Sequence, residues 1–232
     1  MDTILANDHH QPLSLTAADL VAEAHHRVAN SLALLVGMVR MQAASVKKMQ
    51  ANVTNAEVRL LLDGVAVRIN AISQLHRILA RVGADGVIGL KPHLCEVTDA
   101  LVAALSSSEQ GVRVVHTGGD CMVMMRQVQP IVLVLCEVFI NAMKYAHPTG
   151  VPLIMMVDCS AGADGRLNLT ISDDGVGLPE GFDATHGAGL GFKVMRSLAA
   201  ELGSELDIRS THLGLSIRMS IPAGTMVDAK LA

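Results

Sequence analysis

Apolar residues recur at helical spacing through the first third of the chain, and this pattern predicts two long helices. The first begins at Thr16 and Asp19, a capping box whose side chains satisfy the free backbone groups of a helix start. Steps of four and three then join Leu20, Ala24, Val28, Leu32, Leu35 and Val39. After a second box at Thr54 and Glu57, the same steps join Val58, Leu62, Val65, Ile69, Ile72, His76 and Leu79.

The second set alternates steps of four and three without a slip, which is the seam of helices that pair. The break at "ANVTNAE" predicts a turn, so residues 14–84 are expected to form an antiparallel helical hairpin. A hairpin cannot bury both apolar stripes alone. We therefore expect a homodimer in which two hairpins make a four-helix bundle.

Beyond "VGADGVIG", interpreted as a helix end and a hinge, short apolar strands alternate with helices. The expected strands are VRVVHTG, CMVMM, LIMMVDCS, RLNLTISDD, ELDIRS and LSIRMSIP, and the expected helices are LCEVTDALVAALSS, VQPIVLVLCEVFINAMKYA and LGFKVMRSLAAEL. This order predicts a second domain over residues 85–222, an α+β sandwich in which helices cover one face of a mixed sheet. Residues 223–232 are expected to form a flexible tail.

Composition narrows the class of protein. Half of the 232 residues are apolar, and the net charge of −4 gives no electrostatic reason to expect nucleic acid as a partner. The four cysteines form no C-x-x-C pair and suit a reducing compartment. The first residues lack the features of a secretory signal, and apolar runs such as "IVLVL" are too short to cross a bilayer. We therefore expect a cytoplasmic protein with no membrane partner.

Two adjacent histidines stand in "EAHHRVANS", in the first predicted helix. Each helical residue advances by about 100°. His26 therefore falls nearly opposite the centre of the apolar stripe and shares an outward face with Asn30, whereas His25 lies at the edge of the stripe. We predict that His26 faces solvent, which by itself is typical of an ordinary surface residue.

Three polar and glycine-rich patterns follow in the second half. Glu137, Asn141 and Lys144 share one face of an apolar helix, where they could bind Mg²⁺ and the phosphates that it bridges. Asp173 ends a strand before Gly175 and Gly177, so its carboxylate can accept a hydrogen bond from an exocyclic amine of a flat base. Gly187, Gly189 and Gly191 precede a helix and can offer backbone N–H groups to an anion. Each pattern alone is weak, but the ordered set indicates a nucleotide site.

These motifs resemble those of sensor histidine kinases of the HisKA_2 type, from about residue 14 to residue 222. "HRVAN" matches the phosphoacceptor motif H-R-x-x-N, and "EVFINAMKYAHP", "DDGVGLP" and "GAGLG" match the N box and the two glycine boxes. The second half resembles the ATP-binding domain shared by histidine kinases, gyrase, Hsp90 and MutL (the GHKL class).

The resemblance implies a role for each matching residue. It makes His26 the phosphoacceptor, Asn141 the Mg²⁺ ligand, and Lys144 a phosphate contact, with Glu137 positioning water or accepting a proton. Asp173 would recognise adenine, with Gly175 and Gly177 shaping its pocket. Gly187, Gly189 and Gly191 would form a lid over the phosphates.

Three positions depart from the family pattern. Ala29 stands where a lysine is usual, and Leu215 follows Gly214 where a threonine often offers a hydroxyl to phosphate. Little sequence precedes the histidine helix, where many members carry a sensory domain. Arg27 stands where many other histidine kinases have an acidic base, so Glu137 is the first candidate for the base and Glu23 the second.

The predicted function is that of a two-component histidine kinase. It would phosphorylate His26 from ATP–Mg²⁺ and pass the phosphoryl group to an aspartate of a response-regulator receiver domain. The alternatives are a phosphotransferase or scaffold with an inactive nucleotide domain, and a switch ATPase. The sequence leaves open whether a separate sensory protein docks and whether transfer occurs in cis or in trans. His76 is expected on the dimer seam, His147 at a helix end, and zinc is not expected.

Overall fold

The structure is a computed structural model that describes residues 28–40, 43–44, 54–82, 86–106, 111–147, 151–182 and 190–222. It begins with a helix over Val28–Arg40, followed by α2 (Asn55–Val82). The remaining helices are α3 (Leu90–Leu105), α4 (Met125–Tyr145) and α5 (Leu190–Glu201). The strands are β1 (Val87–Gly89), β2 (Val112–Gly118), β3 (Met122–Met124), β4 (Leu153–Ala161), β5 (Arg166–Asp173), β6 (Leu206–Thr211) and β7 (Gly214–Pro222).

The main sheet has five strands in the order β2-β4-β5-β7-β6. β2 and β4 are parallel, and the other neighbours are antiparallel. Alternation sets the buried face, since Leu215, Ile217, Met219 and Ile221 of β7 are all buried. N-terminal helices followed by a mixed sheet with helices on one face confirm the predicted fold class.

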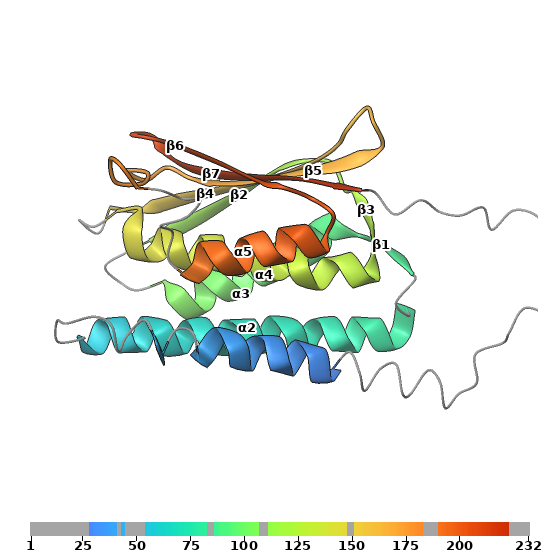
Figure 1. The fold of residues 1–232 in the computed structure, drawn as a ribbon, viewed down its shortest axis with the longest axis horizontal. Coiled ribbons are helices and arrows are strands. Elements are labelled where there is room, and N and C mark those ends of the chain that lie inside the picture. Colours follow the sequence, from blue (N-terminus) through green and yellow to red (C-terminus); the bar gives the residue numbers. More distant parts are fainter. Residues whose placement is uncertain are drawn as a thin grey trace, which may run out of the picture.

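The molecule is layered, with the sheet on top in Figure 1, then α3, α4 and α5, then the two N-terminal helices. α4 lies in the middle layer, which explains why most of its residues are apolar and buried apart from the polar face that carries Glu137, Asn141 and Lys144. By length and composition alone α4 could cross a membrane, but most of it is buried inside this fold. It is therefore the core helix on which the site is built.

The segment "VGADGVIG", interpreted as a helix end and a hinge, contains a strand that the sequence did not predict, while its residues 83–85 lie outside the described part of the chain. Val87–Gly89 forms strand β1, which pairs antiparallel with β3 in a separate two-stranded sheet. Backbone hydrogen bonds from Leu90 N to Cys121 O and from Met125 N to Gly86 O close this small sheet. A strand of three residues, the last of them a glycine, carries too little pattern to be predicted when its partner lies more than thirty positions away.

The N-terminal helices pack against the second half of the chain through a face that overlaps the predicted apolar stripes only in part. Leu35, Met38, Val67, Ala71, Ile72 and Leu75 join the core. Much of the predicted seam is exposed instead: Val58 is 43% exposed, Leu62 64% and Ile69 49%. Each helix therefore has two apolar faces. One face packs toward α4, and the other is exposed to solvent in this single chain. The side chain of His76 and all of residue 26 lie outside the described part of the chain.

Candidate nucleotide-binding site

A cavity of about 640 Å³ lies between α2, α4, the start of α5 and the loop that follows β5. It brings together most of the described site residues that the sequence predicts: Glu137, Asn141, Lys144, Asp173, Gly177 and Gly191 all line it. Apolar walls come from Ile140, Val176, Leu178, Phe182, Phe192 and Leu215. A concave pocket with a few convergent polar groups is the usual form of a small-molecule site.

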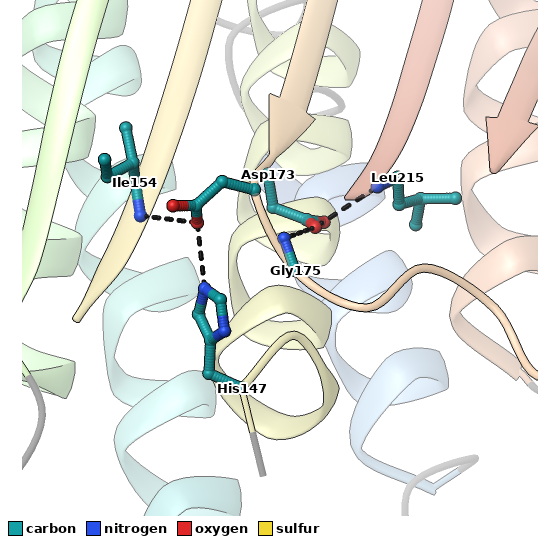
Figure 2. Close-up of polar contacts among 6 residues, drawn as sticks. His147, Ile154, Asp173, Gly175 and Leu215 are labelled. Atoms are coloured by element: carbon teal, nitrogen blue, oxygen red, sulfur yellow. Dashed lines mark hydrogen bonds and ion pairs between the residues drawn. The ribbon is translucent and has the colours of Figure 1, made fainter. Parts of the chain in front are cut away.

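Asp173 occupies one end of the cavity, at the last position of β5. Its Oδ1 accepts hydrogen bonds from the backbone N–H groups of Gly175, at 2.9 Å, and Leu215, at 3.2 Å (Figure 2). Burial raises the pKa of this carboxyl, although both N–H groups oppose the shift. The carboxylate is thus fixed in orientation through Oδ1, as recognition of an amine donor on a base requires.

The departure at Leu215 has a structural explanation. Its backbone N–H, which any residue except proline would supply, holds Asp173, while its side chain forms part of the apolar wall. The preceding Gly214 has φ +131°, and a Cβ there would lie 2.0 Å from the carbonyl oxygen of Asp173. Glycine at 214 is therefore required by close backbone approach and by its φ angle.

The first glycine box is fixed by steric limits as well. A Cβ on Gly175 would lie 2.5 Å from the Cα of Ala146, at the end of α4. Gly177 has φ +71°, and a Cβ there would lie 2.2 Å from the carbonyl oxygen of Thr211. The loop after Asp173 can thus lie against both α4 and the β6–β7 hairpin only because these residues are glycines.

A second carboxylate in this loop has a partner that sequence reasoning missed. Asp174 Oδ1 accepts hydrogen bonds from Ile154 N and pairs with His147 Nε2, both at 2.9 Å (Figure 2). Burial favours a higher pKa for Asp174, but the Ile154 N–H and the imidazole outweigh it, and the pKa is lowered. His147 thus lies at the helix end, as predicted, and also connects the end of α4 to the loop beside Asp173. Position 147 alone gave no signal of this contact.

The other end of the cavity is built on α4. Glu137, Asn141 and Lys144 lie on one face, as their spacing predicts, and line the cavity together. Gly191, in the first turn of α5, lies against Glu137 and Asn141. A Cβ at Gly191 would lie 3.2 Å from Asn141 Nδ2 and 3.3 Å from Glu137 Oε2. These contacts place the N-terminal turn of a helix beside an amide and a carboxylate, and Lys144 lines the same cavity, an arrangement suited to phosphate and a divalent cation.

Glu137 has a charged partner that the sequence analysis did not identify. Arg68 of α2 contacts Glu137 Oε1 through Nε, at 2.8 Å, and through Nη2, at 2.6 Å. Both side chains are buried. Burial raises the pKa of Glu137, against the pull of the guanidinium. The available signal was a lone arginine between Val67 and Ala71, on a helix face that is otherwise apolar.

Three predicted site residues lie outside the described part of the chain: His26, Gly187 and Gly189. Their assigned roles remain predictions. Ala29 and Asn30, which follow His26, are described and exposed at the start of the first helix. Ser31, the next residue, is buried and donates a hydrogen bond from Oγ to Gln129 Oε1, at 2.9 Å, at the beginning of α4.

An apolar pocket with a fixed aspartate at one end and Asn141 beside a helix start at the other defines a nucleotide-binding domain joined to N-terminal helices. Family comparison agrees. Residues 23–105 match the HisKA_2 histidine kinase family, and residues 127–228 match the family described as histidine kinase-, DNA gyrase B- and HSP90-like ATPase. The chain therefore contains a HisKA_2 histidine kinase segment followed by an ATP-binding domain, and it is homologous to sensor histidine kinases.

Relatives of this chain include "Blue-light-activated histidine kinase 2" of Erythrobacter litoralis, 28% identical over 87% of this chain and 56% of the relative. "Sensor histidine kinase PdtaS" of Mycobacterium tuberculosis is 26% identical over 88% of this chain and 39% of the relative. The chain thus spans about half or less of the length of these relatives. Among solved structures, the histidine kinase domain of Erythrobacter litoralis EL346 blue-light activated histidine kinase is similar, with a TM-score of 0.66 and 26% identity over 88% of this chain and 93% of that chain.

Proposed function

We propose that this protein is an ATP-dependent histidine kinase that phosphorylates its own His26 and passes the phosphoryl group to an aspartate of a response-regulator receiver domain. The observation that carries the proposal is the cavity in which Asp173 is held through Oδ1 at one end and Asn141 meets the start of α5 at the other. Homology to sensor histidine kinases supports the same activity.

Each end of the pocket would have a distinct task. The adenine amine would donate to the Asp173 carboxylate, while the apolar walls exclude water from the base. Lys144 and the backbone N–H groups at the start of α5 would bind phosphate oxygens. The amide oxygen of Asn141 fits Mg²⁺, a hard cation that prefers oxygen ligands, and the ion would neutralise charge on the phosphates.

Glu137 is the proposed base. The imidazole nitrogen attacks the terminal phosphorus, the bond to the departing ADP oxygen breaks, and the proton on the other ring nitrogen needs an acceptor. A carboxylate whose pKa is raised by burial is a better proton acceptor near neutral pH than an ordinary one. Its Oε2 lies near Gly191, whereas the ion pair with Arg68 is made through Oε1.

The position of the first helix bears on how His26 would reach the phosphate. Ser31 contacts Gln129, which is eight residues before Glu137 and twelve before Asn141 on α4, or about 12 Å and about 18 Å along the helix. The start of the first helix therefore lies far from the phosphate end in this arrangement. Transfer would need the hairpin to move relative to α4, or a His26 supplied by a second copy.

The uncovered apolar face of the hairpin favours a second copy as its partner. Leu62 and Ile69 on α2, and Leu32 and Val36 on the first helix, are each at least 48% exposed. We predict that Leu62→Glu dissociates a homodimer, measured by light scattering across a concentration series. Leu213→Glu, at a turn residue that is 71% exposed, is the control and should leave the mass unchanged. A monomeric wild type would refute pairing through the hairpin.

The test of kinase activity uses γ-labelled ATP with Mg²⁺. Acid-labile label on the wild type that is lost in His26→Ala is the expected result, because phosphohistidine hydrolyses in acid. Label on an acid-stable residue, or label that survives in His26→Ala, would contradict the proposal. Nucleotide binding without any label would instead favour a switch ATPase, and neither binding nor label would favour a scaffold.

A further inference from the structure

We propose that Arg68, supplied by the hairpin helix α2, is a phosphate-binding residue of the nucleotide site that contacts the terminal phosphate of ATP. The inference rests on the proposed ATP site and adds a residue from outside the ATPase half of the chain. It makes the hairpin one wall of the pocket and the source of a cation for the phosphates.

The location of Arg68 supports this role. Arg68 lines the same cavity as Asn141 and Lys144. Its ion pair with Glu137 stands nine residues before Ala146, where the loop after Asp173 meets α4, which is about 14 Å along the helix. Arg68 therefore lies at the end of the pocket opposite the proposed adenine site, where the last phosphate of an extended nucleotide would lie.

The donor groups of Arg68 are not all used. Nε and Nη2 contact Glu137 Oε1, whereas Nη1 is buried and has no hydrogen-bond partner among the residues that the structure describes. A buried donor without an acceptor carries a free-energy cost, which a phosphate oxygen in the cavity would remove. Because the guanidinium is a planar fork, the pair with Glu137 also fixes the direction of the remaining N–H groups.

A glycine in the middle of α2 keeps space beside this atom. A Cβ on Gly64 would lie 3.3 Å from Arg68 Nη1 and 3.2 Å from Ile140 Cδ1. Glycine inside a helix costs about 1 kcal/mol relative to alanine. The helix thus has a helix-destabilising glycine at a position where a side chain would press against both Arg68 Nη1 and Ile140 of α4.

The charges at this end of the pocket also favour a triphosphate. Without nucleotide, the guanidinium and the Glu137 carboxylate compensate each other in a buried site, as a buried ion requires. A triphosphate brings more negative charge to this end of the pocket than a diphosphate does. Arg68 should therefore favour ATP over ADP and, by reciprocity, ATP should strengthen the contact of the hairpin with α4.

The experiment measures dissociation constants of ADP and a non-hydrolysable ATP analogue, with Mg²⁺, by calorimetry on the full chain. We expect Arg68→Gln to reduce the preference for the triphosphate about tenfold or more, with the ADP constant nearly unchanged, as for loss of a charged hydrogen bond. Arg59→Gln is the matched control, because Arg59 lies on the same helix with an 85% exposed side chain, and it should alter neither constant.

Unchanged ADP binding also reports that the pocket is folded. Should Arg68→Gln fail to fold because Glu137 loses its partner, Arg68→Lys keeps the charge and removes the fork, and it should still lower the preference several-fold. An unchanged or increased preference for the triphosphate in the folded variant would overturn the role of Arg68. Equal weakening of both nucleotides would overturn it too, whereas a wild type that binds neither nucleotide would refute the proposed ATP site itself.

Discussion

The two ends of the pocket are built in different ways. At the Asp173 end, backbone N–H groups of Gly175 and Leu215 hold the carboxylate, and every contact comes from the ATPase half of the chain. At the Glu137 end, a side chain from the hairpin, Arg68, holds the carboxylate. The first end is therefore independent of where the hairpin lies, while the second depends on it.

The difference suggests that one end of the pocket only binds the nucleotide, whereas the other end also senses the position of the hairpin. An adenine site made of backbone groups and glycines is fixed once the sheet has folded, since its geometry follows from strand ends and steric limits. A phosphate site that shares a residue with the hairpin changes whenever the hairpin moves. In a kinase whose phosphoacceptor helix must move, such sharing would link the nucleotide state to the helix position.

The largest effect is expected at the adenine end. Asp173→Asn keeps an oxygen that can accept from Gly175 and Leu215, so the fold should persist, but it replaces a carboxylate acceptor by an amide. We expect ADP and ATP analogues to bind about a hundredfold more weakly, from the loss of a charged hydrogen bond worth about 3 kcal/mol. Calorimetric titration measures this, and near-wild-type affinity in a folded variant would show that Asp173 does not contact the base.

The next effect concerns stability of the same end. Gly177→Ala should lower the free energy of unfolding by about 2 kcal/mol more than Gly181→Ala, as judged by urea denaturation. Both glycines have positive φ, +71° and +75°, but only Gly177 also faces a backbone oxygen, at 2.2 Å from an added Cβ. Equal losses in the two variants would mean that φ strain alone matters and that the loop does not need this close approach.

A smaller effect is expected at the phosphate end. Asn141→Ala should remove the dependence of ATP-analogue affinity on Mg²⁺, a loss of about tenfold at saturating metal, because it deletes an oxygen ligand. Binding measured without Mg²⁺ should be nearly that of the wild type. Retained Mg²⁺ dependence in the variant would assign the metal to other ligands.

The smallest effect tests the His147–Asp174 contact. The pKa of Asp174 is lowered in the folded state, so its contribution to stability is present above the unfolded value of about 3.9 and is lost as pH falls through the folded value. Asp174→Asn should therefore destabilise the protein at pH 7 by less than about 1 kcal/mol, since the pair is partly exposed, and hardly at all near pH 2. An equal loss at both pH values would contradict an ionic contribution.

Whether a contact could be predicted from the sequence depends on how many positions separate its two residues along the chain. The helix face of Glu137, Asn141 and Lys144 follows from the 3.6-residue period, and the glycines near Asp173 follow from the backbone freedom of glycine. Arg68 with Glu137 is a pair 69 residues apart, and His147 with Asp174 a pair 27 apart. Spacing along one element cannot predict such partners, because they depend on how helices pack together.

The hairpin shows the same limit. Over the described residues, its apolar period correctly predicts helix at Val28–Arg40 and Asn55–Val82, but not which of two apolar faces is used within the chain. Ile72 is both on the predicted seam and in the core, while Leu62 on the same seam is exposed. Periodicity shows that a face is apolar, and only the packed structure shows what covers it.

The most direct measurement compares how Asp173→Asn and Arg68→Gln affect the binding of ADP and of an ATP analogue in the full chain. If one end is self-contained and the other is shared with the hairpin, Asp173→Asn weakens both nucleotides alike, and Arg68→Gln weakens only the triphosphate. If Arg68→Gln leaves triphosphate binding intact, or weakens both nucleotides to the same degree, Arg68 does not contact the terminal phosphate and the account of the shared end is wrong.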